Sequence, residues 1–391
     1  MASSVLRQRD GDEAPRVTNM ELFFDLVYVF AITQLSAFLF DNLTARGALQ
    51  AAIMFLAVWW AWNYTAWATN WLDPARGAGA LLMFVLMVLG LVMSAAIPRA
   101  FEDRGVPFAC SYVALQVVRS AFMVFAFPRG DRMRRNFAQL LAWSAIAGVV
   151  WIVGATVLDG NARLIAWGAA VLLDVAAPAH GFRLPGMGAT PPTTWSLAGS
   201  HLAERSQLVL MIALGESVLR VGLTFSEGEG SPAADAAFLV GFVSSASMWA
   251  TYFLRTAERG AQAAAETIGS SVGRSAYTYA HAVMVAGVLV QAVGIHEAIE
   301  APTEPVDAGA TAVILGGPMM YLAGLLLFKR WVGQTRLQPL VAAIGVLAAL
   351  VLVAVAGGDR LLLSACATVV LAILAVAAAL GGEGLDAPRE G

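Results

Sequence analysis

Apolar runs of about 20 residues, separated by short polar segments, recur along most of the chain. A helix rises 1.5 Å per residue, so each run is long enough to cross ~30 Å of hydrocarbon. The pattern predicts an all-α, polytopic transmembrane helical bundle of about 12 spans, with eleven as the alternative count. The predicted spans are residues 20–41, 47–70, 77–98, 106–127, 137–157, 161–179, 203–225, 234–257, 275–298, 308–328, 338–356 and 360–380.

Composition agrees with this pattern. Of 391 residues, 59% are hydrophobic and 13% are charged, whereas a soluble domain carries about 25% charged residues. Cys110 and Cys366 stand far apart in separate apolar runs. We expect them to be small buried side chains, with no disulfide framework and no metal-binding spacing. The sequence therefore predicts no metal and no cofactor, and nothing in it resembles a nucleic-acid-binding surface.

The polar segments divide the chain into five parts. Residues 1–16 lack the apolar core and cleavage site of a signal peptide, so the first span is expected to stay as a membrane anchor. Residues 17–180 and 201–380 form two six-span halves around a Gly- and Pro-rich linker, 181–200. If the halves are repeats, six spans each would give them one orientation, as parallel repeats. The alternative to a repeat is that the two halves match only because all membrane helices are alike at this level. Residues 381–391 are expected to be a disordered tail.

Basic residues in the loops predict the orientation. Arginine and lysine concentrate in alternate loops, and cytoplasmic loops carry this excess. We therefore expect both termini on the cytoplasmic side of the membrane. The segments on the predicted inner side hold Arg7, Arg9, Arg16, Arg76, Arg129, Arg132, Arg134, Arg135, Arg183, Arg255, Arg259, Arg274, Lys329, Arg330, Arg336 and Arg389.

The first span holds the first candidate site residues. Glu21 and Asp25 are four residues apart, which places them on one face of a helix, and Tyr28 follows one turn later. A bare carboxylate in hydrocarbon costs roughly 3 kcal/mol or more. Such a residue normally faces the bundle interior and has a partner.

The seventh span holds the second group. His201 and Arg205 share a face, next to Glu204, and Glu216 lies farther along the helix. We expect Glu216 near mid-bilayer, with Gly215 allowing close approach of another helix and Ser217 available for a hydrogen bond. Interfacial capping and snorkelling are the alternative explanation for His201 and Arg205.

Further embedded polar residues lie in other spans. Asn63 in the second span is assigned to the bundle interior near Asp25. Arg119 in the fourth span is too deep to snorkel easily, and it is the expected counter-ion of Asp25, Asp174 or Glu216. These charges either line a pathway for an ion or proton, or act as structural pairs that fix helix packing.

Two motifs together carry a resemblance to a known family. They are Glu21-Leu-Phe-Phe-Asp25-Leu-Val-Tyr-Val-Phe-Ala, and His201-Leu-Ala-Glu204-Arg205 with Leu214-Gly215-Glu216-Ser217. The chain resembles the bacterial low temperature requirement A (LtrA) family over roughly residues 15–380. The resemblance implies a multi-pass bacterial inner-membrane protein and a link to cold growth, but it specifies no substrate and no catalytic residue.

The sequence favours a transporter or an ion- or proton-conducting protein, with a pathway between the first and seventh spans. Its site residues would be Asp25, Glu216, Arg119, Asp174, Arg205, His201, Glu204, Glu21, Ser217 and Asn63. No soluble-enzyme motif is present, so no catalytic residue is assigned. The alternatives are an intramembrane lipid-modifying enzyme using His201, Glu204 and Glu216, and a non-catalytic scaffold or stress-related protein. The expected partners are the lipid bilayer and a small ion or solute. A homodimer is one assembly that the sequence allows.

Overall fold

The structure, a computed structural model, describes residues 5–7, 17–190, 195, 199–227, 230–254, 256–266, 275–334 and 336–380. In these ranges eleven helices are long and apolar enough to cross a membrane. The same residues form isolated β-bridges but no strand. The predicted all-α polytopic bundle is therefore confirmed. The predicted disordered tail, 381–391, and most of segment 1–16 lie outside the described residues.

The helices follow the predicted spans closely. The eleventh predicted span is built from two consecutive helices, α13 and α14, and a short helix that was not predicted, α9, follows α8. A π-helical turn, Ala276–Ala280, leads into α11. The helices are α1 (Asn19–Asp41), α2 (Ala45–Ala68), α3 (Gly77–Ala96), α4 (Gly105–Ala126), α5 (Arg132–Thr156), α6 (Gly160–Ala179), α7 (Gly199–Glu227), α8 (Pro232–Phe253), α9 (Thr256–Glu266), α11 (His281–Glu300), α12 (Ala308–Trp331), α13 (Gln338–Ala349), α14 (Val351–Val355) and α15 (Arg360–Leu380).

Helix α2 explains why the count can be eleven or twelve. It has 24 residues, long enough to span, but it is not among the eleven apolar candidates. Its second half carries tryptophans together with Asn63, Tyr64 and Thr65, and every residue of 57–68 is buried. A helix that contacts protein on all sides does not need a lipid-facing apolar surface, so it can keep polar side chains.

The described helices divide into two compact units. Unit 1 comprises Met1–Ile212 and Ala264–Thr278, and unit 2 comprises Ala213–Ala263 and Tyr279–Gly391. The boundary thus falls within α7, whereas the sequence predicts a boundary at 181–200. The predicted six-span repeat stays a prediction.

The described part of the linker folds as part of unit 1. Gly181, Gly186 and Gly188 adopt positive φ, which glycine tolerates without a steric penalty. Residues Leu184 and Gly188 close an isolated β-bridge. Trp195 is buried against the rings of Trp67, Trp71, Phe137 and Phe182. The linker is therefore anchored by aromatic packing.

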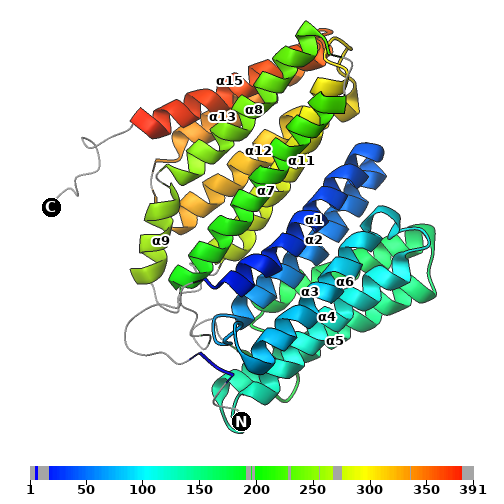
Figure 1. Ribbon diagram of the computed structural model, residues 1–391, viewed down its shortest axis with the longest axis vertical. Coiled ribbons are helices and arrows are strands. Elements are labelled where there is room, and N and C mark those ends of the chain that lie inside the picture. The colour runs from blue at the N-terminus through cyan, green and yellow to red at the C-terminus, as the bar shows by residue number, and fades with distance from the viewer. Residues whose placement is uncertain are drawn as a thin grey trace, which may run out of the picture. The chain divides into compact units, whose positions relative to one another are not determined.

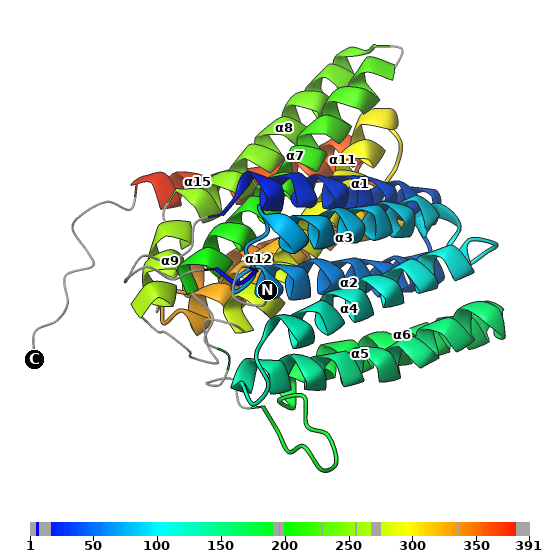
Figure 2. The same ribbon diagram turned by 60° about the horizontal axis from the view of Figure 1, so that its bottom comes forward.

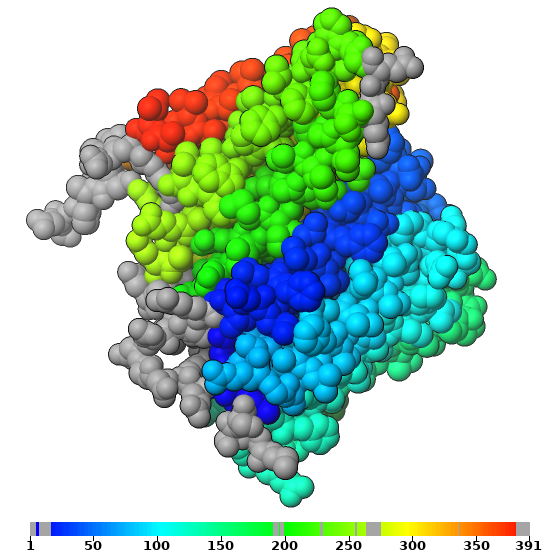
Figure 3. Space-filling view, viewed as in Figure 1, coloured from blue at the N-terminus to red at the C-terminus, as the bar shows by residue number. Residues whose placement is uncertain are grey.

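Within unit 1, α3, α4, α5 and α6 pack in turn as antiparallel neighbours, whereas α1 and α3 are parallel neighbours. Helix α5 packs against both α4 and α6, and the three helices lie close together (Figure 1 and Figure 2). Helix α1 runs along α3 on one face of the unit, where both are visible in the space-filling view (Figure 3). On α1 the side chains of Leu22, Phe23 and Leu26 are exposed, whereas Glu21 and Asp25 are fully buried. The helix therefore turns its apolar face outward and its carboxylates inward, as a membrane helix with a polar partner should.

Within unit 2, glycines let α11 and α12 approach very closely. A Cβ at Gly287 would lie 2.4 Å from the backbone nitrogen of Tyr321, and one at Gly317 would lie 2.5 Å from that of Gln291. Gly294 and Gly324 make similar contacts with the facing helix. Close backbone approach of this kind stabilises helix pairs in lipid, where the hydrophobic effect does not drive association.

The two cysteines differ from the prediction. Cys110 is exposed, Cys366 is partly exposed, and both are free. The predicted burial is wrong because apolar runs in a membrane protein also supply the lipid-facing surface, where a small apolar thiol is tolerated.

A glycine substitution tests the packing of α11 against α12. Gly317→Leu should lower the melting temperature of the purified protein, because a Cβ there meets backbone atoms that cannot move aside. Overpacking typically costs about 1–3 kcal/mol. Gly316→Leu is the matched control, since a Cβ at Gly316 meets no atom within 4 Å. Equal melting temperatures for the two variants would contradict this account.

Candidate functional site

The site begins at the N-terminus of α1, which a capping box defines. The Thr18 hydroxyl accepts a hydrogen bond from the Glu21 backbone N–H at 3.3 Å. In return, Glu21 Oε2 accepts from the Thr18 backbone N–H at 2.9 Å and from its hydroxyl at 3.0 Å. This reciprocal arrangement satisfies free N–H groups of the first turn and fixes the position of the Glu21 carboxylate.

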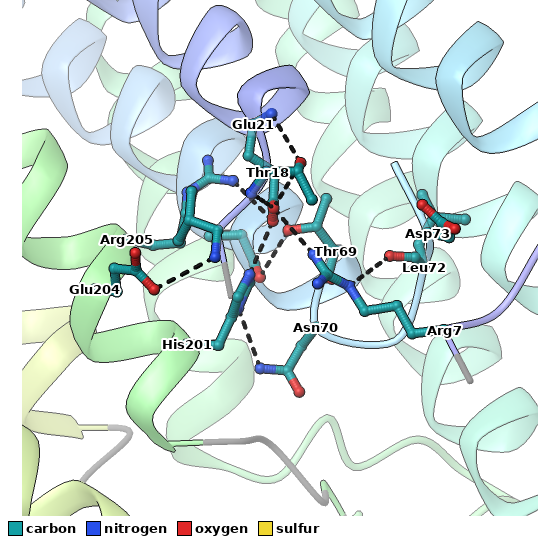
Figure 4. Close-up of polar contacts among 12 residues, drawn as sticks. Arg7, Thr18, Glu21, Thr69, Asn70, Leu72, Asp73, His201, Glu204 and Arg205 are labelled. Atoms are coloured by element: carbon teal, nitrogen blue, oxygen red, sulfur yellow. Dashed lines mark hydrogen bonds and ion pairs between the residues drawn. The ribbon is translucent and has the colours of Figure 1, made fainter. Parts of the chain in front are cut away.

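Three cationic or imidazole side chains converge on the same carboxylate (Figure 4). His201 Nε2 and Arg205 Nη1, both from the first turns of α7, lie 2.9 Å and 3.1 Å from Glu21 Oε1. Arg7 Nη2 lies 2.9 Å from Oε2. The Glu21, His201 and Arg205 side chains have no exposed surface. Glu21 therefore has every oxygen engaged, as a buried carboxylate requires.

Asp25, one turn farther along α1, is less completely bonded. Its Oδ1 contacts Arg205 Nη2 at 2.6 Å and accepts from Trp62 Nε1 at 2.9 Å. The Arg205 guanidinium also lies over the Trp62 ring, 5.8 Å from its centroid. Asp25 Oδ2 is buried and has no hydrogen-bond partner among the described residues, and the same holds for the Tyr28 hydroxyl. Asp25 thus keeps one oxygen available for a further ligand.

Arg7 comes from the N-terminal segment. Besides Glu21, its Nε donates to the carbonyl oxygens of Thr69 and Leu72, just after α2, at 2.9 Å and 3.0 Å (Figure 4). An isolated β-bridge between Leu6 and Leu72 holds the segment in place. This residue was not predicted as part of the site, because hydropathy places it only in a polar terminus.

We call Arg7, Glu21, Asp25, His201 and Arg205 the ion-pair cluster. His201 Nδ1 lies 3.4 Å from the amide nitrogen of Asn70, which can only donate. If Nδ1 accepts from this amide, Nε2 donates to Glu21 and the ring is neutral. Two carboxylates and two guanidinium groups then balance, so the cluster carries no net charge in its buried setting.

Glu204, from the same motif, lies outside the cluster. It is exposed, and its Oε2 accepts a hydrogen bond from the Val17 backbone N–H at 3.3 Å. The structure therefore brings together Glu21, Asp25, His201 and Arg205 of the predicted site residues, and it leaves Glu204 at the periphery.

A second buried network surrounds Asp174 of α6. Its Oδ2 accepts from the Tyr112 hydroxyl at 2.7 Å and from Trp151 Nε1 at 3.4 Å. Gln116 donates to the Tyr112 hydroxyl at 2.9 Å, and Arg119 donates to Gln116 Oε1. A continuous hydrogen-bonded chain therefore connects Asp174 to Arg119.

Arg119 differs from its predicted role. It makes no ion pair within 4 Å among the described residues. Its Nη1 lies 3.3 Å from both the Ala61 carbonyl and the Thr65 hydroxyl, and its guanidinium lies 5.4 Å from the Tyr64 ring centroid. Of the three acids that the sequence offers as its counter-ion, Asp25, Asp174 and Glu216, the first contacts Arg205 instead. The charge of Arg119 interacts with Asp174 only at longer range.

Asp25, Arg205, Arg119 and Asp174 lie in one layer of unit 1. Asp25 and Arg205 follow the starts of α1 and α7 by six residues, and Arg119 and Asp174 precede the ends of α4 and α6 by seven and five residues. Consecutive helices alternate in direction, so these ends lie on the same side. At 1.5 Å per residue the layer lies about 8–10 Å inside the helix ends.

The remaining predicted residues lie elsewhere. Asn63 is buried, and its Oδ1 accepts from the Thr278 hydroxyl at 3.4 Å. In unit 2, Glu216 is buried with Arg220 Nη2 3.7 Å away, and the Ser217 hydroxyl donates to the Val288 carbonyl at 3.4 Å. The predicted helix contact at Gly215 is not made within unit 2, since a Cβ there meets nothing within 4 Å.

Fold and site define a polytopic helical membrane protein with a buried, charge-balanced ion-pair cluster. The chain belongs to the family of bacterial low temperature requirement A protein (LtrA), whose model matches residues 16–377. It is 36% identical over 330 residues to an uncharacterized protein of Rhizobium meliloti (strain 1021), covering 83% of this chain and 80% of that protein. No solved structure matches the chain. The family resemblance predicted from the two motifs is confirmed.

Removing the Glu21 charge tests the ion-pair cluster. Glu21→Gln should lower the free energy of unfolding by about 3–5 kcal/mol, because Arg7 and Arg205 each lose a partner in a buried site. Glu204→Gln is the matched control. It removes a charge from the exposed surface near the same helix ends and should cost under about 1 kcal/mol. Reversible unfolding in mixed micelles measures both, and a smaller loss for Glu21→Gln than for Glu204→Gln would contradict the account.

Proposed function

We propose that the protein is a membrane transporter or conducts an ion or proton, with Asp25 as the carboxylate that exchanges its ligand. Helix α1 and the polar face of α7 would line the pathway. In unit 1 that face carries Ser206 and Gln207 after the ion-pair cluster, and in unit 2, taken by itself, the rest of α7 carries Glu216, Ser217 and Arg220. Ionisable residues inside membrane segments typically mark ion or proton pathways.

The observation that carries this proposal is the half-bonded state of Asp25. It is fully buried, yet Oδ2 has no hydrogen-bond partner among the described residues, and the nearby Tyr28 hydroxyl is in the same state. Tyr28 interacts electrostatically with Asp25, Arg119 and Arg205. A proton, a water molecule or a small cation at Asp25 Oδ2 would complete this carboxylate. Arg205 would then be free to shift toward Glu21, which it already contacts.

A structural scaffold is the second candidate. Glu21 favours it, because both its oxygens are saturated by Thr18, His201, Arg205 and Arg7, the pattern expected of a fixed connection between helices. The lipid-modifying enzyme has less support. The His201 ring is occupied by Glu21 and Asn70, and Glu204 points instead to the Val17 backbone.

The proposed location follows from the basic loops. We place the protein in the bacterial inner membrane with both termini in the cytoplasm, which puts the layer of charged groups in the inner leaflet. Protease accessibility of the basic loops in spheroplasts checks this orientation. The solute is then a small ion or proton that reaches Asp25 from the cytoplasmic side, and the protein acts as a monomer or a homodimer.

Flux through reconstituted protein tests the function. Proteoliposomes containing the wild type should conduct protons or a small cation, and Asp25→Asn should reduce the rate by at least about tenfold. Placing a cation in hydrocarbon without its counter-charge costs a few kcal/mol, whereas a tenfold lower rate requires a barrier only about 1.4 kcal/mol higher. Glu216→Gln should also reduce flux.

The matched control is Asp41→Asn, which removes an exposed carboxylate at the other end of α1. It should conduct like the wild type. Equal flux for Asp25→Asn and Asp41→Asn would show that Asp25 is not part of the pathway. Absence of flux in every sample, with the proteins folded, would favour the scaffold.

A further inference from the structure

Unit 2 contains a narrow cavity that plays no part in the proposed pathway. It lies between α8, α11, α12 and α15, and its free space is about 270 Å³ when the open mouth is counted. The enclosed part has room for about one water molecule. Small residues, among them Gly241 of α8 and Gly294 of α11, form much of its wall.

Part of the cavity lining is polar. Gln291 of α11 donates from Nε2 to the Ser244 hydroxyl of α8 at 2.8 Å, and its Oε1 has no hydrogen-bond partner among the described residues. The two side chains are buried, with 6% and 1% of their surface exposed. If the Gln291 side-chain amide were flipped, its oxygen would accept from the Ser244 hydroxyl and its nitrogen would have no partner. A buried polar atom without a partner costs about 1–3 kcal/mol, so a hydrogen-bond donor at the Gln291 oxygen would be favourable.

These groups lie far inside the membrane. Ser244 and Gln291 are nine or more residues from both ends of α8 and α11, which corresponds to at least about 14 Å. Ser364 and Thr368 line the cavity from α15, one turn apart. Hydrocarbon cannot satisfy the free Gln291 oxygen at that depth, so a polar molecule must enter if the atom is to be bonded.

Charge restricts what that molecule is. No lining residue of the cavity is ionisable. Arg360, one turn before Ser364, is engaged by Glu297 at 3.0 Å and lies 3.7 Å and 3.8 Å from Glu304 and Asp307. An ion in the cavity would find no opposite charge in its lining, whereas an uncharged donor would find an amide oxygen and hydroxyl groups.

We infer that this cavity binds a single hydroxyl group, supplied by a water molecule or by an uncharged hydroxylated molecule that enters through the mouth. The hydroxyl donates to Gln291 Oε1, and the hydroxyls of Ser364 and Thr368 face the same space. The bound group connects α8, α11 and α15 at mid-bilayer. This inference concerns unit 2 alone and does not depend on flux through the ion-pair cluster.

High-resolution electron cryomicroscopy of the full chain in lipid nanodiscs tests the inference. The wild type should show density within hydrogen-bond distance of the Gln291 amide. Gln291→Met keeps the side-chain length but removes the acceptor, and it should lose that density. Ser244→Ala leaves Gln291 in place and should retain it. Ser247→Ala is the matched control, because this buried α8 serine bonds to the Val243 carbonyl and does not line the cavity.

The shape of the density distinguishes the two sources of the hydroxyl. A single round peak identifies water, and an elongated one identifies a larger hydroxylated molecule, which mass spectrometry of a solvent extract then detects. Either result supports the site. An empty cavity in the wild type, or density that persists unchanged in Gln291→Met, would overturn the inference.

Discussion

The cost of placing charge in hydrocarbon dictates the architecture of unit 1. Glu21 and Asp25 are fully buried on the first helix, so cations and hydrogen-bond donors from other parts of the chain must meet them. Arg205 does so from α7, about 180 residues later, and Arg7 does so from the N-terminal segment. The contacts of Arg205 with Glu21 and Asp25 fix the rotation and depth of the first turns of α7 against α1.

Helix α2 provides the remaining donors. Trp62 donates to Asp25, Asn70 follows the helix and faces His201, and the Ala61 carbonyl and Thr65 face Arg119. The helix therefore contacts both the ion-pair cluster and the Asp174 network. This double role accounts for its low hydropathy: its surroundings are protein, and its polar groups are those that the buried charges need. A polar layer in one leaflet follows, and Asp25 Oδ2 and the Tyr28 hydroxyl are among its atoms that have no hydrogen-bond partner in the part of the chain that the structure describes.

Hydropathy and the two motifs predict much of this structure from the sequence. The spans, the burial of Asp25 and Arg119 and the convergence of the first and seventh spans follow from the cost of burying charge. The pairings do not, because a balance of embedded charges does not say which cation meets which acid. For that reason the sequence does not reveal that Arg205, rather than Arg119, contacts Asp25. The role of Arg7 could not be predicted, because the residue lies in a polar N-terminal segment. The capping box could have been predicted, because Thr18 and Glu21 are three residues apart and match its sequence signature.

The central claim is that Asp25 and Arg205 interact directly and hold α1 against the first turns of α7. A double-mutant cycle measures this most directly, through the free energies of unfolding of wild type, Asp25→Asn, Arg205→Met and the double variant. Arg205→Met leaves Asp25 without its ion-pair partner, and Asp25→Asn leaves Arg205 with Glu21 alone. The double variant should therefore lose about 2–3 kcal/mol less than the two single losses combined. Losses that add to within about 0.5 kcal/mol would show that the two side chains are not coupled, and would contradict the account.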